Sequence, residues 1–109
     1  AMIEIDTNGI CHRWNDAATA LFGWTAEEML THELTASIIP EAYREAHRQG
    51  LRHYRETNEA PLVDKVATLQ ALTKDKGPIT IEIRLTKHLG PDGTRFLARI
   101  SPTPTGRSS

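Results

Sequence analysis

Apolar residues alternate with polar ones near both ends of the chain and recur at helical spacing between them. Residues 2–6, Met-Ile-Glu-Ile-Asp, predict a short strand, and residues 10–14 predict its partner in a hairpin. The Asn8-Gly9 pair predicts the turn between the two strands, because both residues tolerate a positive φ. The side chains expected on one face of the second strand are Ile10, His12 and Trp14.

The first helix is predicted over residues 17–22. Asn15 or Asp16 can cap its free backbone N–H groups, and Gly23 is placed to end it. Residues 25–30 predict a further helical turn, because Thr25 and Glu28 have the spacing of a capping box. Residues 31–37 are polar and are predicted to be irregular.

The longest helix is predicted over residues 41–56. Pro40 suits its first turn, and Asn58 is a residue that accepts the left-handed conformation in which many helices end. One face of this helix is expected to carry Tyr43, His47, Leu51 and Tyr54.

Beyond this helix the period changes to two. Strands are predicted over residues 66–72, 79–86 and 96–100, with turns at 74–78 and 90–93. Two groups of antiparallel strands separated by helices indicate an α+β domain in which the helices cover one face of a five-stranded sheet. A pocket between sheet and helices is the expected place for a ligand.

Length and composition narrow the class of protein. The chain has 109 residues, enough for one domain, which we assign to residues 1–101, with residues 102–109 as a tail or linker. Thirteen Lys and Arg against fourteen Asp and Glu give no basic excess that would favour nucleic acid. The apolar runs are too short to span a membrane. Cys11 is the single cysteine, which excludes an internal disulfide and a cysteine zinc site and is compatible with the cytoplasm.

Several sequence fragments, taken in order, resemble a PAS domain. They are Ile-Asp, Asn-Gly-Ile, Trp-Asn, Ala-Ala and Leu-Phe-Gly-Trp within residues 5–24, Ile-Ile-Pro at 38–40, Ala-His-Arg-Gln-Gly-Leu at 46–51, and Leu-Gln-Ala-Leu-Thr-Lys-Asp at 69–75. The chain is similar to bacterial PAS modules, in particular to the oxygen-sensor-like subgroup. The resemblance implies a sheet in the order 2-1-5-4-3.

The resemblance also implies a function. PAS domains sense a small ligand or a partner in signalling proteins, two-component systems among them, and pass a conformational change to an attached effector. We therefore expect a cytoplasmic sensory domain that forms a homodimer. No phosphate loop, zinc motif or nucleophile motif occurs in the sequence, so a kinase or cyclase activity would belong to other parts of the protein. The alternative is a ligand-free dimerisation module, and a void of roughly 300 Å³ or more between sheet and helix would favour a ligand.

Candidate pocket residues are apolar side chains of the predicted helices and strands, together with one histidine. They are Leu21, Phe22, Met29, Ile38, His47, Leu51, Tyr54, Leu69, Ile81, Ile83, Phe96 and Ala98.

No cofactor is the leading expectation, with haem and flavin as alternatives. His47 matches the position of the axial histidine in haem-binding relatives, but Ala67 stands where those sensors carry a gas-contacting arginine. We therefore expect His47 to be a structural residue that bonds to a backbone carbonyl or a carboxylate. A photoactive flavin site would need a cysteine between residues 31 and 40, and there is none.

Overall fold

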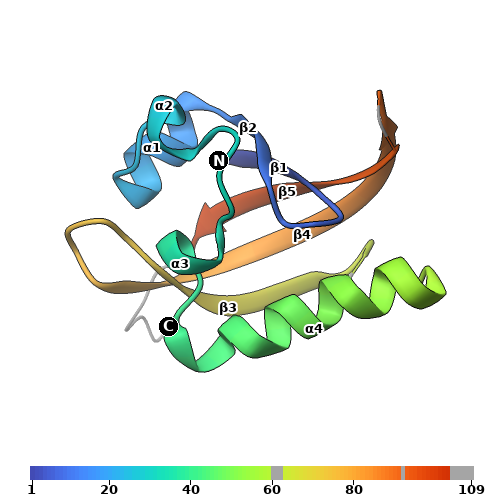
Figure 1. Cartoon of the computed structure of the whole chain (residues 1–109). Coiled ribbons are helices and arrows are strands. Elements are labelled where there is room, and N and C mark those ends of the chain that lie inside the picture. The colour runs from blue at the N-terminus through green and yellow to red at the C-terminus, as the bar shows by residue number, and fades with distance from the viewer. Residues whose placement is uncertain (60–62, 92, 104–109) are drawn as a thin grey trace.

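A computed structural model describes residues 1–59, 63–91 and 93–103 of the chain (Figure 1). Over these residues, five strands form one antiparallel sheet in the order β2-β1-β5-β4-β3, which confirms the predicted topology. The elements in chain order are β1 (Met2–Asp6), β2 (Cys11–Trp14), α1 (Asp16–Phe22), α2 (Ala26–Met29), α3 (Thr35–Ile38), α4 (Glu41–Thr57), β3 (Val66–Leu72), β4 (Pro78–Gly90) and β5 (Gly93–Pro102).

The first hairpin forms as predicted, but its second strand does not alternate strictly. The register of β1 and β2 shifts by one residue, so that His12 is an extra residue without a partner on β1. This bulge lets Cys11 and Trp14, three positions apart, both reach the core, where they are 0% and 5% exposed. The predicted face of Ile10, His12 and Trp14 is therefore wrong.

The first two helices are capped as the sequence predicts. The Asn15 side chain accepts a hydrogen bond from the backbone N–H of Ala18, and Gly23 ends α1 with φ +86°. Thr25 and Glu28 form a complete capping box at the start of α2.

The segment before α4 is more ordered than expected. Residues 31–37 were predicted to be irregular, but α3 occupies Thr35–Ile38. Leu34 and Ile38 are buried against the core at 5% and 4% exposure. The burial of these side chains outweighs the weak helix propensity of Thr35 and Ser37 between them.

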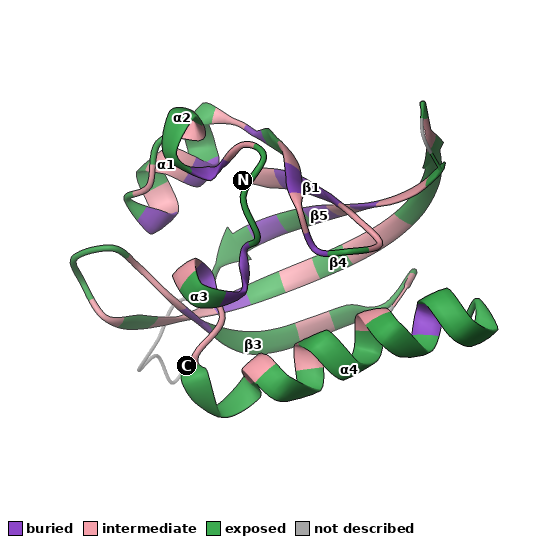
Figure 2. Cartoon of the chain, viewed as in Figure 1, coloured by how far each residue is buried: buried purple, intermediate pink, exposed green. Residues whose placement is uncertain are grey.

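The long helix α4 has the predicted position but a smaller buried face. Asn58 closes it in the left-handed conformation, with φ +63°, as expected. Tyr54 is its buried residue, whereas Tyr43 is 54% exposed, so the predicted apolar face does not extend to the first turn. Figure 2 shows most of α4 exposed. The helix is rich in Arg and Glu and has too few apolar side chains to seat its whole length on the sheet.

The last strands are longer than their apolar alternation indicates. β4 and β5 have 13 and 10 residues, and they pair from Ile81 opposite Pro102 to Gly90 opposite Gly93. Thr103 then donates its backbone N–H to the carbonyl of Thr80, slightly beyond residue 101, where we placed the end of the domain. Residues 104–109 of the predicted tail, and Asp92 of the predicted turn, lie outside the described residues.

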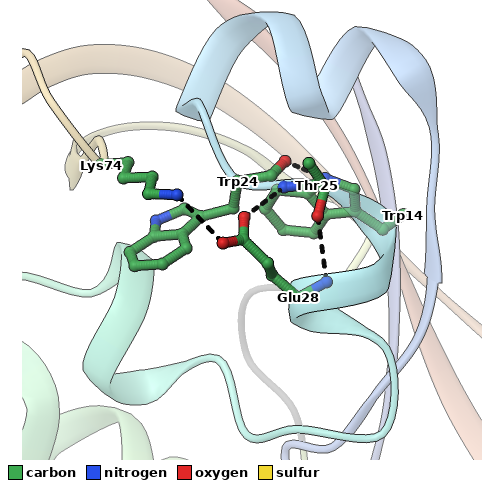
Figure 3. Close-up of polar contacts among 5 residues, drawn as sticks. All are labelled: Trp14, Trp24, Thr25, Glu28 and Lys74. Atoms are coloured by element: carbon green, nitrogen blue, oxygen red, sulfur yellow. Dashed lines mark hydrogen bonds and ion pairs between the residues drawn. The ribbon is translucent and has the colours of Figure 1, made fainter.

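Two tryptophans join α1 and α2 to the hairpin (Figure 3). Trp14 donates its indole N–H to Thr19 Oγ1 at 3.1 Å. The same N–H donates to the carbonyl oxygen of Trp24 at 2.9 Å, the bond drawn in Figure 3. Lys74 comes from the turn between β3 and β4. Its Nζ lies 5.2 Å from the centre of the Trp24 ring and forms an ion pair with Glu28 Oε2 at 3.0 Å. This end of the domain is thus tied together by segments far apart in the sequence.

We predict that Trp14→Phe lowers the free energy of unfolding by about 1–3 kcal/mol, because it leaves the part-buried carbonyl of Trp24 without its side-chain donor. Urea denaturation measures this change. Trp24→Phe is the matched control, because Trp24 Nε1 has no hydrogen-bond partner among the described residues, and it should cost less than Trp14→Phe. An equal cost for the two variants would contradict the assigned role of the Trp14 bond.

Candidate ligand cavity

A cavity of about 290 Å³ lies between α4 and the inner face of the sheet. Its wall is almost entirely apolar, and side chains from β1, α3, α4 and β3 to β5 contribute to it. The lining residues are Ile3, Ile5, Leu34, Ile38, Ile39, Ala46, His47, Gly50, Leu51, Tyr54, Lys65, Ala67, Leu69, Ile83, Leu85, Phe96, Ala98 and Ile100.

Most of the predicted pocket residues meet in this cavity. Those that line it are Ile38, His47, Leu51, Tyr54, Leu69, Ile83, Phe96 and Ala98. Those that do not are Leu21, Phe22, Met29 and Ile81. Phe22 and Met29 are fully buried on α1 and α2, and Ile81 is 4% exposed. Phe22, Met29 and Ile81 thus belong to the packed core, and Leu21 is a partly buried side chain that packs against it.

The prediction missed several lining residues. Ile3, Ile5 and Leu85 follow the same two-residue period as the strand residues that were chosen, so the pattern could have identified them. Gly50 and Lys65 carry no signal of burial in the sequence. Only the path of the chain around the cavity brings them to its wall.

Tyr54 fastens the C-terminal half of α4 to the sheet. Its ring packs edge-on against Phe96, with centroids 5.1 Å apart and planes at 82°, and its hydroxyl donates to Thr94 Oγ1 at 3.4 Å. Arg55 adds a bond of 2.6 Å from its guanidinium to the carbonyl of Thr7.

The N-terminal end of α4 has a separate attachment. Arg44 donates its Nε–H to the carbonyl of Ile39, which precedes the helix, at 2.8 Å. The middle of α4, where Ala46, His47 and Gly50 line the cavity, lies between these two attachments. The helix is therefore held near its ends and stands over the cavity in its middle.

His47 contributes a polar group to the cavity wall. Its buried Nδ1 has no hydrogen-bond partner among the described residues, so the expected bond to a carbonyl or a carboxylate is not made at this atom. Burial lowers the pKa of His47, although the negative charge of Glu33 acts in the opposite direction. The ring is therefore neutral at pH 7, with one nitrogen that can donate and one that can accept.

Gly50 lines the cavity from the helix side and is exposed. It lies in the interior of α4, where a glycine costs about 1 kcal/mol relative to alanine. A Cβ atom built on Gly50 would have no atom within 4 Å, so steric crowding does not require this glycine. Its structural effect is the space that it leaves beside the cavity.

Other reactive groups have structural surroundings. Cys11 is fully buried, and burial raises the pKa of its thiol to about 11, which keeps it protonated and unreactive. In the described part of the chain, no three His, Cys, Asp or Glu side chains come together to hold a metal ion. None of the described helices is long and apolar enough to cross a membrane.

A second hollow, of about 400 Å³, lies on the outer face of the sheet. It is open, and charged side chains such as Glu82, Arg84 and Arg99 contribute to its wall. An open groove with a charged wall is less suited to enclosing a small ligand than the apolar cavity beneath α4.

A small antiparallel sheet that holds an apolar cavity beneath a helix is the layout of a ligand-binding or sensory domain. The family model of the PAS fold matches residues 1–103. The chain therefore belongs to the PAS family.

The comparisons with individual proteins agree with this assignment. An uncharacterised protein of Azorhizobium caulinodans is 32% identical over 88 residues, which are 81% of this chain and 12% of that protein. The chain thus spans only about an eighth of the length of this relative.

Solved PAS domains share the fold at low sequence identity. A PAS domain of Desulfitobacterium hafniense has a TM-score of 0.74 at 16% identity, covering 94% of this chain and 91% of that one. A PAS domain of a two-component sensor histidine kinase has a TM-score of 0.70 at 14% identity, with coverages of 94% and 84%. The PAS domain of the quorum-sensing receptor RpfR of Cronobacter turicensis, solved with BDSF, has a TM-score of 0.68 at 12% identity, with coverages of 94% and 92%.

We predict that the domain loses stability as the pH falls below about 6.5, the ordinary pKa of histidine. The unfolded chain protonates His47 before the folded chain does, because the folded pKa is lowered. Urea denaturation at several pH values between 7.5 and 5 measures the effect. His47→Leu should reduce this pH dependence, whereas His32→Leu, at an exposed position outside the cavity, should leave it unchanged. An unaltered pH profile in His47→Leu would contradict the assignment.

Proposed function

We propose that this PAS domain is the sensory module of a signalling protein and binds a small, mainly apolar ligand between α4 and the sheet. The observation that carries the proposal is the apolar cavity of about 290 Å³. His47 lines this cavity, and its buried Nδ1 has no hydrogen-bond partner among the described residues. The volume is close to 300 Å³, the lower end for ligand pockets, so volume alone does not separate a sensor from a filled core. A histidine in the wall, where a ligand-free core would carry an apolar side chain, favours the sensor.

The proposed mechanism is a shift between two positions of α4. A ligand beneath the middle of the helix contacts both α4 and the sheet, and it stabilises the arrangement in which both contacts are made. The attachments at Tyr54 and Arg44 guide this movement, because they hold the helix near its ends. The changed position of α4 then biases an attached effector.

The setting of the domain in a longer signalling protein rests on its relatives. The Azorhizobium protein is much longer than this chain, and two of the structural neighbours come from a sensor histidine kinase and a quorum-sensing receptor. These similarities support a cytoplasmic sensor of bacterial type with an effector, of kinase or cyclase class, outside this chain. In this proposal the domain is not itself an enzyme.

The second candidate function is a ligand-free dimerisation module. The open groove on the outer sheet face favours it, because Glu82 there lies near Arg84 and Arg99, and opposite charges on one surface permit pairing with a second copy. A homodimer is compatible with either function.

Haem fits this cavity less well than a smaller ligand. His47 offers a suitable nitrogen, but a porphyrin needs more room than about 290 Å³ between α4 and the sheet. Ala67 in the opposite wall provides no polar contact for a bound gas. The ligand proposed here is therefore smaller than a haem.

We predict that octan-1-ol, an apolar probe of suitable size, binds the wild-type chain and shifts the NMR signals of α4 and β3. Ala67→Leu should abolish this binding, because the larger side chain occupies the cavity, while the free energy of unfolding changes by no more than about 1 kcal/mol. Thr68→Leu is the matched control, at the next residue of the same strand and with an exposed side chain that does not line the cavity.

The two candidate functions give different results in this titration. Binding that is lost in Ala67→Leu and kept in Thr68→Leu supports the sensor. The absence of binding in the wild type, together with a more stable Ala67→Leu variant, would contradict it and favour the dimerisation module.

A further inference from the structure

We infer that the cavity takes a small monocarboxylate with an apolar body of about seven carbon atoms, whose carboxylate binds Lys65 at the cavity mouth. This inference rests on the proposed function, since it names the chemical class of the ligand for the same site. It follows from the charges in the cavity wall, the course of the chain next to β4, and the size of the space.

The charges in the wall favour an anion. Lys65 is the only residue of the types Lys, Arg, Asp and Glu among the described residues that line the cavity. It has no carboxylate within ion-pair distance in the described part of the chain. An apolar wall with one cation at its edge complements a ligand that is apolar over most of its length and negative at one end.

The other polar groups of the wall do not compete for this role. The hydroxyl of Tyr54 already donates to Thr94. His47 is neutral at pH 7, because burial lowers its pKa. The imidazole can form a hydrogen bond to a ligand, but Lys65 supplies the positive charge.

A tight turn places Lys65 at the cavity. Val63 forms a parallel bridge with Leu85 of β4, and Asp64 donates its backbone N–H to the carbonyl of Leu85 at 2.7 Å. Asp64 has φ +67°, a left-handed conformation that is uncommon outside glycine but tolerated by aspartate. These two contacts fix the chain beside Leu85, which itself lines the cavity. Lys65 directly follows Asp64 and therefore also reaches the cavity wall.

Lys65 is exposed although it lines the cavity, so this residue stands where the cavity meets solvent. A lysine in this position keeps its hydration while its stem covers apolar surface. An anionic ligand could then bind without burying its charge, with the carboxylate at the mouth and the apolar body inside.

The volume limits the length of the ligand. If each non-hydrogen atom occupies roughly 30 Å³, the share of one water molecule in the liquid, a space of about 290 Å³ holds roughly ten such atoms. A carboxylate group and a body of seven carbons, together ten non-hydrogen atoms, fill this volume. Octanoate is therefore the probe that best represents the class.

The test compares octanoate with octan-1-ol, which has the same chain length and no charge, by titration calorimetry at pH 7.5. Octanoate is ionised at this pH. We expect the wild-type chain to bind octanoate at least tenfold more tightly than octan-1-ol. In Lys65→Met, which keeps the length of the side chain and removes its charge, this preference should be lost while octan-1-ol still binds.

Lys76→Met is the matched control, because Lys76 is an exposed lysine in the turn between β3 and β4 and does not line the cavity. It should keep the wild-type preference. Equal affinities for the two probes in the wild type, or a preference that survives in Lys65→Met, would overturn the assignment of the ligand class and leave the apolar sensor intact. If neither probe binds the wild type, both the ligand class and the proposed sensor are contradicted.

Discussion

The attachment of α4 near its ends is the constraint on which the candidate site depends. Tyr54 packs against Phe96 at one end, and Arg44 bonds to the carbonyl of Ile39 at the other. Between them Ala46, His47, Gly50 and Leu51 line the cavity, so Leu51 is the one large apolar side chain of this stretch. A helix with continuous apolar contacts would have closed onto the sheet and left no cavity.

The opposite end of the domain is built in another way. There, Trp14 and Phe22 lie in ring contact, and the indole N–H of Trp14 connects the hairpin to the segment between α1 and α2. Lys74 reaches this segment from the turn between β3 and β4. The domain thus combines an end where the helices are bonded to the hairpin with an end where α4 covers a cavity. In the proposed mechanism, α4 moves while the sheet stays in place.

Local signals explain what the sequence could predict. The caps at Asn15 and Thr25 and the end of α4 at Asn58 depend on neighbouring residues, and these predictions were confirmed. The order of the strands came from the family resemblance and was also confirmed. Long-range packing explains what was missed. The bulge at His12 depends on how β2 pairs with β1, and the short helix α3 depends on its burial against the core.

The candidate site shows the same limit. Apolar periodicity selected Ile83, Phe96 and Ala98, which line the cavity, but it equally selected Phe22, which is part of the buried core. Periodicity shows which side chains face inward, and it does not show where the interior contains a space. Lys65 was missed because its place at the cavity depends on the turn at Asp64, and no local sequence pattern predicts this turn.

Amide hydrogen exchange of the free domain, and of the domain with octan-1-ol, tests the central claim most directly. If α4 stands over a cavity and a ligand holds it, the amides around Gly50 should exchange many times faster than those of the paired strands β4 and β5, and the ligand should slow them selectively. Exchange in α4 as slow as in these strands, with no response to the ligand, would show that the helix is seated on a filled core and would contradict the account.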